Sequence, residues 1–298
     1  MKLRLAMYLI TGANGFIGQR LVNKLKREGV SYKIISSSTQ KISEDVISWG
    51  ELNSTHKIHS FLNGNNYKLI HCGWGGVLGK DRNELTQVIN NHPIILGLDK
   101  LLETGLITHI SALGSQAEYG VKNKMLDETE TCFPKTIYAK AKLAHYHLID
   151  SLASYYNVPF SWLRIFSLFG EGDNPNWLLP MTITKLSQGE RVDLSPCTQT
   201  WDYLSVEDAV DAIISVSRSK ARGILNVASG SPVVLKDILL EIGKEMDRSA
   251  FLNFGAIKLR DNEPNYLLAD ITKIKRETGW TPKINIWTEI PRMIKYYG

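Results

Sequence analysis

The sequence predicts an α/β fold: a Rossmann-like, doubly wound parallel sheet with a smaller C-terminal substrate-binding lobe. Over the first two thirds of the chain, short apolar runs bounded by Gly, Asn or Ser alternate with longer amphipathic stretches, which is typical of strand-helix-strand units. A glycine-rich loop follows the first of these runs. The length of 298 residues fits about two domains of roughly 150 residues.

Composition and charge exclude several classes of protein. The 35 basic and 30 acidic residues give a net charge of +5, spread along the chain, which is too weak an excess for a nucleic-acid-binding stripe. Charged residues at 22% and apolar residues at 43% exclude a disordered, collagen-like, mucin-like or coiled-coil chain. We therefore expect a globular protein with no nucleic-acid partner.

Cysteine usage and the length of apolar runs indicate the compartment. Cys72, Cys132 and Cys197 are an odd number with no Cys-x-x-Cys pair, so the sequence predicts neither a disulfide framework nor a metal site. Residues 5–10 are too few for a signal-peptide core, and no run of about 18 apolar residues occurs. The expected location is a reducing cytoplasm, without a membrane partner.

The predicted strands and helices follow one another in the order of a doubly wound sheet. Apolar residues at helical spacing, such as Ala144 and Leu148, predict helices over Phe16–Arg27 and 137–156. The predicted buried strands are residues 5–10, Tyr32–Ser36, 69–72, 107–111 and Phe160–Ile165.

The sequence changes in character at a Gly/Asn/Pro-rich loop, residues 170–180, after which the segments are shorter. A helix is predicted over 206–217, with Ser205 as its N-cap and Asp208 completing a box-like cap. Residues 224–228 are predicted as a short strand that returns to the main sheet.

The glycine loop predicts dinucleotide binding. Thr11-Gly12-Ala13-Asn14-Gly15-Phe16-Ile17-Gly18 follows the first strand and opens the first helix. Glycine there permits a tight turn, lets backbone N–H groups approach a pyrophosphate, and lets the helix pack close to the sheet. The residues expected to contact the cofactor are Gly12, Asn14, Gly15, Phe16, Ile17 and Gly18.

The end of the second strand favours NADP(H) over NAD(H). NAD sites usually place a carboxylate there for the ribose 2′-hydroxyl, whereas this chain has no acid until Glu44. Ser36, Ser37, Ser38 and Lys41 are expected to hold a 2′-phosphate instead, with a solvated loop charge as the alternative for Lys41.

A second set of residues supplies acid-base chemistry. Tyr138 and Lys142 stand four residues apart on one helix face, and an adjacent ammonium lowers the pKa of a phenol. Upstream lies Ser115-Gln116-Ala117-Glu118-Tyr119-Gly120. With the glycine loop, these residues make the chain resemble the extended short-chain dehydrogenase/reductase superfamily. The resemblance implies Ser115, Tyr138 and Lys142 as catalytic residues, the latter two also contacting the cofactor. Ser111 is a competing serine, for which a cap or turn hydroxyl is the favoured role.

Three further segments resemble that superfamily. His71-Cys72-Gly73 resembles its His-Leu-Ala turn over the cofactor. Leu163-Arg164-Ile165-Phe166-Ser167-Leu168-Phe169-Gly170 resembles its Leu-Arg-x-Phe-Asn-x-Tyr-Gly segment, with Ser167 where Asn is usual. Asn91 matches a recurrent Asn, although alignment on Gly97 places it a few residues early. The further cofactor contacts that the resemblance implies are Cys72, Gly73, Asn91 and Phe166.

The C-terminal part resembles a narrower group. Residues 254–264 are similar to the corresponding stretch of nucleotide-deoxysugar enzymes, particularly CDP-abequose and CDP-paratose synthase-like reductases. Arg260 is implied to bind the diphosphate, since a guanidinium makes two charge-assisted bonds to phosphate, with a solvated arginine as the alternative. Trp201 stands where many relatives have a second phosphate-binding Arg. The implied substrate contacts are Ser115, Gln116, Tyr138, Ser167, Trp201 and Arg260.

The resemblance also narrows the reaction. Gln116-Ala117 replaces the Asp-Glu pair of dehydratases, which disfavours dehydration, and Cys72, Cys132 and His145 do not match the Cys and His pair of 3,5-epimerising reductases. The expected function is NADPH-dependent reduction of the C4 keto group of a dTDP- or CDP-4-keto-6-deoxyhexose, in deoxysugar biosynthesis for surface polysaccharide. The alternatives are a nucleotide-sugar 4-epimerase with tightly bound NAD and a non-catalytic NADP-sensing regulator.

The expected architecture follows from these assignments. Residues 1–169 plus 206–228 are predicted as an NADP-binding Rossmann domain, and residues 170–205 plus 229–298 as a nucleotide-sugar-binding lobe. The resemblance further implies a homodimer formed through the helix that carries Tyr138.

Overall fold

The computed structural model describes residues 7–37, 45–77, 79–259 and 264–298 of the chain. Three of the predicted ligand-binding residues, Ser38, Lys41 and Arg260, lie outside the described residues.

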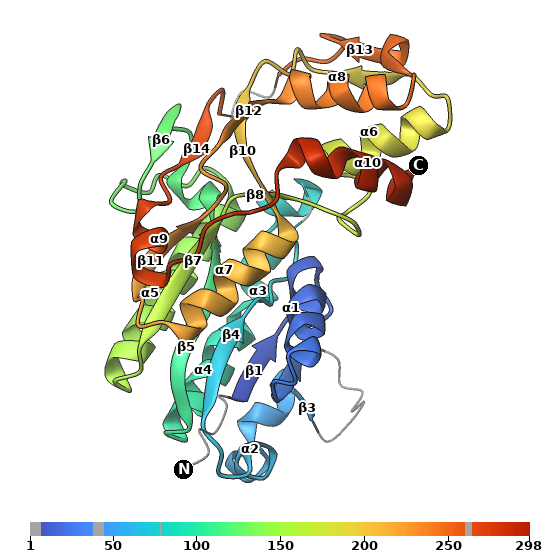
Figure 1. Cartoon of the computed structure of the whole chain (residues 1–298). Coiled ribbons are helices and arrows are strands. Elements are labelled where there is room, and N and C mark those ends of the chain that lie inside the picture. The colour runs from blue at the N-terminus through green and yellow to red at the C-terminus, as the bar shows by residue number, and fades with distance from the viewer. Residues whose placement is uncertain (1–6, 38–44, 78, 260–263) are drawn as a thin grey trace.

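The centre of the protein is a seven-stranded parallel sheet in the order β11-β7-β5-β4-β1-β2-β3 (Figure 1). The order reverses beside β1, where Ile10 pairs with Ile34 of β2 on one side and with Ile70 of β4 on the other. In such sheets, ligands bind at the carboxyl ends of the strands next to this reversal. The strands are β1 Met7–Thr11, β2 Tyr32–Ser36, β3 Val46–Ser48, β4 Tyr67–His71, β5 Ile107–Ser115, β7 Phe160–Ile165 and β11 Gly223–Val227.

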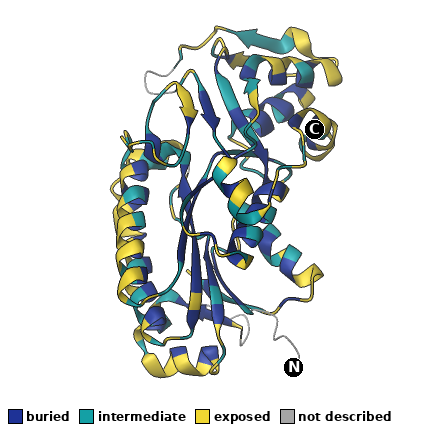
Figure 2. Cartoon of the chain, turned by 60° about the vertical axis from the view of Figure 1, so that its left-hand side comes forward, coloured by how far each residue is buried: buried dark blue, intermediate teal, exposed yellow. Residues whose placement is uncertain are grey.

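Helices cover both faces of this sheet, as expected for a parallel sheet whose strands are buried on both sides. One face is covered by α1 and α7 and the other by α4 and α5, each layer with its own apolar core. Figure 2 shows these helices buried toward the sheet and exposed outward. The bounds of these helices are α1 Phe16–Arg27, α4 His92–Glu103, α5 Ile137–Tyr155 and α7 Val206–Arg218. The same part of the chain also contains α2 Thr55–Leu62 and α3 Thr86–Ile89, and α9 Thr272–Thr278 packs beside α7.

The C-terminal part contributes a third apolar cluster, between α6, α8 and α10. A three-stranded sheet in the order β12-β10-β8 connects this cluster to the main body, and two small pairs, β13-β9 and β14-β6, complete the strands. The bounds are β6 Lys124–Leu126, β8 Ser167–Phe169, α6 Leu178–Ser187, β9 Val192–Leu194, β10 Thr200–Ser205, β12 Pro232–Val234, α8 Leu235–Glu245, β13 Leu252–Phe254, β14 Leu267–Ala269 and α10 Ile286–Tyr297.

Four short 3₁₀ helices complete the described elements. They are η1 Trp49–Asn53, η2 Gly79–Asn83, η3 Gln116–Tyr119 and η4 Ser249–Phe251. Among the described residues, no helix is both long and apolar enough to cross a membrane.

The predicted doubly wound parallel sheet is confirmed, including the return of the strand near residues 224–228 beside β7. The prediction for 107–111 is too short, because β5 continues to Ser115. β3 was not predicted. The division into the two stated lobes stays a prediction.

The N-terminal cap predicted for α7 is confirmed only in part. Ser205 is its N-cap, and its Oγ accepts from the backbone N–H of Glu207. The box-like cap from Asp208 is wrong: this buried carboxylate instead accepts the backbone N–H groups of Lys283 and Ile284. The Asp208 carboxylate, which the local spacing predicted as part of the cap, is therefore used in a contact with a distant segment of the chain.

Candidate active site

The glycine loop has the shape that a dinucleotide pyrophosphate requires. Gly12 has φ +69°, and a Cβ there would lie 2.6 Å from the backbone of Gly73. A Cβ at Gly18 would lie 2.0 Å from the carbonyl oxygen of Gly12. Gly15, the N-cap of α1, has no capping side chain, and the first turn has no acid. The first N–H groups of a twelve-residue helix therefore suit an anion, so these residues fit the cofactor.

The adjoining loop after β4 is fixed to β1. The hydroxyl of Thr11 lies 2.6 Å from Nδ1 of His71 and accepts from the backbone N–H of Gly73 at 3.1 Å. The buried Asn91 accepts from the N–H of Gly75 at 2.9 Å and donates to the carbonyls of Gly75 and Gln87. Asn91 thus shapes this loop, while a direct contact with the cofactor stays a prediction.

Three other predicted cofactor residues lie at the ends of β2 and β4, the two neighbours of β1 in the sheet. Ser36 ends β2 and Ser37 follows it, exposed. Cys72 follows β4 beside Gly73, and burial raises the pKa of its thiol to about 12. Cys72 therefore stays a neutral thiol at physiological pH.

The structure brings Ser115, Tyr138 and Lys142 together. Ser115 is the last residue of β5, whereas Tyr138 and Lys142 lie in the first turns of α5, which Thr136 caps. All three are buried. The Ser115 Oγ accepts from the N–H of Ala117 at 3.2 Å, and the Ser115 side chain lies close enough to the Tyr138 phenol to lower its pKa. The rival Ser111 lies inside β5 with no hydrogen-bond partner for its Oγ among the described residues, so its predicted cap or turn role is wrong.

The electrostatics of Tyr138 differ from the sequence prediction. Burial raises the pKa of Tyr138 above its usual value, against the lowering effects of the Ser115 hydrogen bond and the Arg82 charge. The ammonium of Lys142 donates to the carbonyl of Leu113 at 2.8 Å, and burial lowers its own pKa to about 8. The predicted net lowering of the Tyr138 pKa is therefore wrong here, because desolvation of the phenolate outweighs the nearby charges.

Trp74 is an active-site residue that the sequence did not reveal. Its ring lies edge-on to Tyr138, with centroids 6.1 Å apart, and its face lies 4.0 Å from Nζ of Lys142. It also packs against His145 at 4.8 Å, and its Nε1 donates to Gln87. Trp74 comes from the loop after β4, directly after the recognised His71-Cys72-Gly73 turn, and it was not itself part of a recognised motif.

Glu118 lies within the Ser115 motif but was assigned no role. Its fully buried carboxylate accepts from the backbone N–H of Ser115 at 2.7 Å and from Nε1 of Trp162 at 3.0 Å. Nε of Arg164, on β7, donates to the same carboxylate at 2.9 Å. The Glu118–Arg164 ion pair thus fixes the end of β5 where Ser115 begins η3.

The predicted substrate residues outside the triad are dispersed over three elements. Gln116 lies in η3 and Ser167 in β8, both half-buried. Trp201, in β10, stacks on Tyr203 with centroids 6.3 Å apart, so its observed role is packing. Phe166, which was predicted as a cofactor contact, lies between β7 and β8 and is buried. Ligand contacts of these side chains stay predictions.

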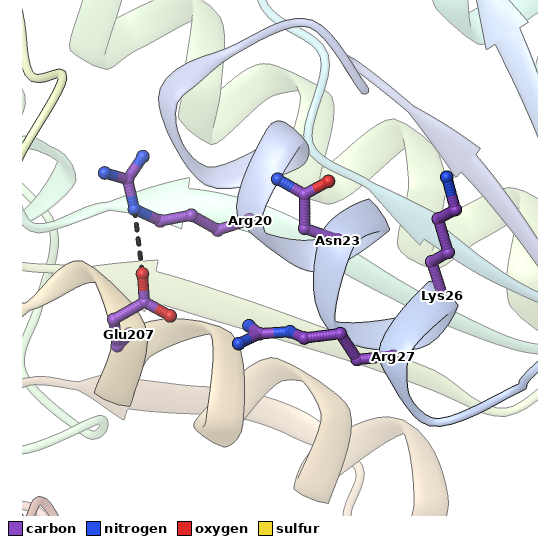
Figure 3. A pocket seen from close by; sticks show the side chains of 5 residues that line it. All are labelled: Arg20, Asn23, Lys26, Arg27 and Glu207. Carbon is purple, nitrogen blue, oxygen red and sulfur yellow. Dashed lines mark hydrogen bonds and ion pairs between the residues drawn. The ribbon is translucent and has the colours of Figure 1, made fainter.

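A surface pocket of about 370 Å³ lies apart from the triad. Figure 3 shows its side chains on α1 and α7, where Nε of Arg20, on α1, lies 3.1 Å from Oε1 of Glu207, on α7. The remaining lining residues are Asn23, Lys26 and Arg27. None of the described residues assigned to the catalytic or cofactor sites lines this pocket.

Comparison with known proteins agrees with this geometry. The chain is 24% identical over 301 residues to CDP-abequose synthase of Salmonella muenchen and 24% identical over 306 residues to dTDP-4-dehydro-6-deoxyglucose reductase of Escherichia coli, with 96% of each chain covered. A UDP-N-acetylglucosamine 4-epimerase from Methanobrevibacter ruminantium has the same fold, with a TM-score of 0.85 at 22% identity over 99% of both chains. The Thermotoga maritima UDP-glucose 4-epimerase gives 0.84 at 19% identity over 98% of both chains. Residues 8–228 match the model of the NAD dependent epimerase/dehydratase family, and the chain belongs to that family.

Proposed function

We propose that the protein reduces the C4 keto group of a dTDP- or CDP-4-keto-6-deoxyhexose with NADPH, in deoxysugar biosynthesis for surface polysaccharide. The observation that carries the proposal is that Ser115, Tyr138 and Lys142 lie buried at the carboxyl end of the sheet, Ser115 at the end of β5 and the other two in the first turns of α5. Similarity along nearly the whole chain to a CDP-abequose synthase and a dTDP-4-dehydro-6-deoxyglucose reductase supports the substrate class.

The side chains present can carry the proton chemistry of a ketone reduction. The bound nicotinamide supplies the hydride. The Ser115 Oγ accepts from the N–H of Ala117, so its single O–H proton remains to be donated. When substrate binds, this proton would turn from the Tyr138 oxygen to the substrate oxygen and orient the carbonyl. Tyr138 then protonates the developing alkoxide as the general acid. Lys142, protonated below its pKa of about 8, supplies positive charge beside the site.

We propose NADP(H) as the preferred cofactor. The absence of an acid between Ser36 and Glu44 supports this preference, because no carboxylate there can repel a 2′-phosphate. Dissociation constants for NADPH and NADH, measured by fluorescence titration, test it: we expect tighter binding of NADPH, and tighter binding of NADH would contradict the proposal.

The reaction is tested by loss of NADPH absorbance on addition of enzymatically prepared dTDP- or CDP-4-keto-6-deoxyglucose, with NMR analysis of the product. Tyr138→Phe should abolish turnover while NADPH binding is retained. Tyr155→Phe, at an exposed position on the same helix, is the matched control and should keep full activity. Turnover by Tyr138→Phe would remove Tyr138 from the mechanism.

A nucleotide-sugar 4-epimerase is the second candidate, favoured by the fold likeness to two 4-epimerases. An epimerase would retain its dinucleotide through the cycle, so cofactor that co-purifies with the protein, and turnover without added NADPH, would favour it. The same NMR assay distinguishes a reduced product from an epimer.

We also propose a cytoplasmic homodimer formed through α5 and its neighbours. Exposed apolar side chains on α5, on α4 and in or beside α3 support this surface. They are Leu85, Val88, Ile89, Leu96 and Leu148. Sedimentation equilibrium should give twice the chain mass, and Leu96→Glu should shift the protein toward monomer.

A further inference from the structure

A second cation lies against Tyr138 and comes from outside α5. The guanidinium carbon of Arg82, in η2, lies 5.0 Å from the centre of the Tyr138 ring. The same carbon lies 5.7 Å from the ring of Trp177, the residue that caps α6. Arg82 thus contacts the proposed acid on one side and an aromatic ring from the C-terminal part on the other.

No partner among the described residues neutralises the charge of Arg82. Its one hydrogen bond to another described residue is a long one, from Nε to the carbonyl of Val77 at 3.4 Å. Within the described ranges, no carboxylate lies at ion-pair distance from its guanidinium. Since arginine stays protonated at every physiological pH, its positive charge acts on the phenol permanently.

Lys142 lies in a different position from Arg82 relative to the Tyr138 ring. Its ammonium is directed at the carbonyl of Leu113 and the face of Trp74, and Trp74 presents its edge to Tyr138. Its pKa of about 8 means that it loses its charge within the range where enzymes are assayed. The guanidinium of Arg82 lies against the phenol ring itself and stays charged above pH 8. Arg82 therefore holds a positive charge at the phenol under conditions in which Lys142 does not.

The other polar and charged groups around Tyr138 also affect how readily its phenol ionises. η3 contributes Glu118, whose negative charge opposes phenolate formation, and β5 contributes the Ser115 hydroxyl, which favours it. α5 itself contributes Lys142 and, behind Trp74, His145, whose pKa burial lowers to about 4 and which is therefore neutral. Arg82 is the cation that opposes both the burial of the phenol and the charge of Glu118.

We propose that Arg82 is a positioning residue for Tyr138: by lying on the ring, its guanidinium stabilises the phenolate and makes Tyr138 a stronger acid for proton transfer to the substrate. The inference rests on the proposed role of Tyr138. The interaction needs no contact between Arg82 and the substrate, which separates it from a role in binding the diphosphate.

The first test measures the phenol directly, without substrate. The protein is labelled with 3-fluorotyrosine, whose phenol ionises at lower pH than tyrosine, and the Tyr138 signal is assigned in ¹⁹F NMR as the one that Tyr138→Phe lacks. Arg82→Gln should move its titration midpoint to higher pH by about one unit, from loss of an opposite charge at this range. Arg82→Lys should recover part of the shift. Lys80→Gln, which removes an exposed cation from the same 3₁₀ helix, should leave the midpoint unchanged.

The second test uses the reaction. Tyr138 must be protonated to act as an acid, so the alkaline fall in kcat should move to higher pH in Arg82→Gln, and kcat at pH 7 should fall several-fold because a weaker acid donates less readily. KM for the sugar nucleotide should stay within about twofold of wild type.

The two tests separate the possible failures. An unchanged Tyr138 midpoint in Arg82→Gln overturns the inference even if the reaction is as proposed. A raised KM with unchanged kcat assigns Arg82 to substrate binding and also overturns it. If the midpoint shifts but neither ketosugar is reduced, the electrostatic role of Arg82 stands and the proposed reaction fails.

Discussion

The ammonium of Lys142 lies over the face of the Trp74 indole, with Nζ 4.0 Å from the ring centroid. Its hydrogen bond goes to the carbonyl of Leu113, and no carboxylate among the described residues forms an ion pair with it. A ring face and one carbonyl replace the water around a charge only in part, so burial lowers the Lys142 pKa from 10.5 to about 8. The proposed catalytic cation is therefore held at a cost in stability.

Removing that cation should stabilise the fold. Since the folded-state pKa of Lys142 lies below the unfolded value, the unfolded chain binds more protons between pH 8 and 10.5, and wild-type stability rises with pH across this window. Lys142→Met should be more stable than wild type at pH 7, by about 1–2 kcal/mol once the lost hydrogen bond is counted. Urea denaturation at pH 7 and pH 9.5 measures both effects.

The matched control for this change is Lys140→Met, which removes an exposed ammonium from the same helix. It should leave both the stability at pH 7 and its rise with pH within about 0.5 kcal/mol of wild type. A Lys142→Met protein less stable than wild type at pH 7 would contradict the assignment of a destabilising charge.

The ion pair of Glu118 with Arg164 should be costly to break. Both side chains are at most 2% exposed, and Arg164 Nη1 has no hydrogen-bond partner among the described residues, so Glu118→Gln leaves a buried cation without a counter-charge. We expect a loss of about 3–5 kcal/mol in the free energy of unfolding, measured in urea. The double variant Glu118→Gln, Arg164→Met should recover part of the loss, and a single-variant loss below about 1 kcal/mol would refute this account.

The parts of the site that the sequence predicted are those with a local signature. Gly12 and Gly18 are required by their own turn, and Tyr138 and Lys142 share a face by helical spacing alone, so neither pair needs knowledge of the rest of the fold. Each of the main-sheet strands that the sequence predicted has five or more residues in the structure. β3, Val46–Ser48, has three residues, too short a run to predict a strand.

The residues that the sequence missed act across the fold. Arg82, in η2, reaches Tyr138, and Trp74, in the loop after β4, reaches Lys142, each over more than fifty residues of sequence. Glu118 meets Arg164 only because β5 and β7 are neighbours in the sheet. The sign of the Tyr138 pKa shift was also missed, because desolvation depends on burial that spacing does not report.

Gly18 should tolerate no side chain. A Cβ there would lie 2.0 Å from the Gly12 carbonyl oxygen and 2.9 Å from Cα of Ala13, both backbone atoms that cannot move away cheaply. Gly18→Ala should push α1 away from the loop, weaken NADPH binding at least tenfold and lower the melting temperature. Gly50→Ala, where no atom lies within 4 Å of the new Cβ, should leave both unchanged. Wild-type cofactor affinity in Gly18→Ala would show that the loop is not the pyrophosphate site.

The carboxylate of Asp202 should be essential to the junction between β10, β12 and β14. It is fully buried and accepts from the N–H of Ser229 at 2.7 Å, of Gly230 at 3.0 Å and of Ala269 at 3.2 Å, and also from the Ser229 hydroxyl. Asp202→Asn places an amide N–H against N–H donors, so we expect a loss of about 2–4 kcal/mol in unfolding free energy.

The destabilisation caused by Asp202→Asn should be confined to this junction. Hydrogen exchange of the Gly230 and Ala269 amides should accelerate in Asp202→Asn more than exchange in β1, because the lost acceptor held those two amides directly. Asp193→Asn, which changes an exposed carboxylate on β9, should alter stability by less than about 0.5 kcal/mol and leave both amides unchanged. Uniform acceleration across the protein in Asp202→Asn would instead mean that the carboxylate stabilises the fold globally and does not act as a clamp at this junction.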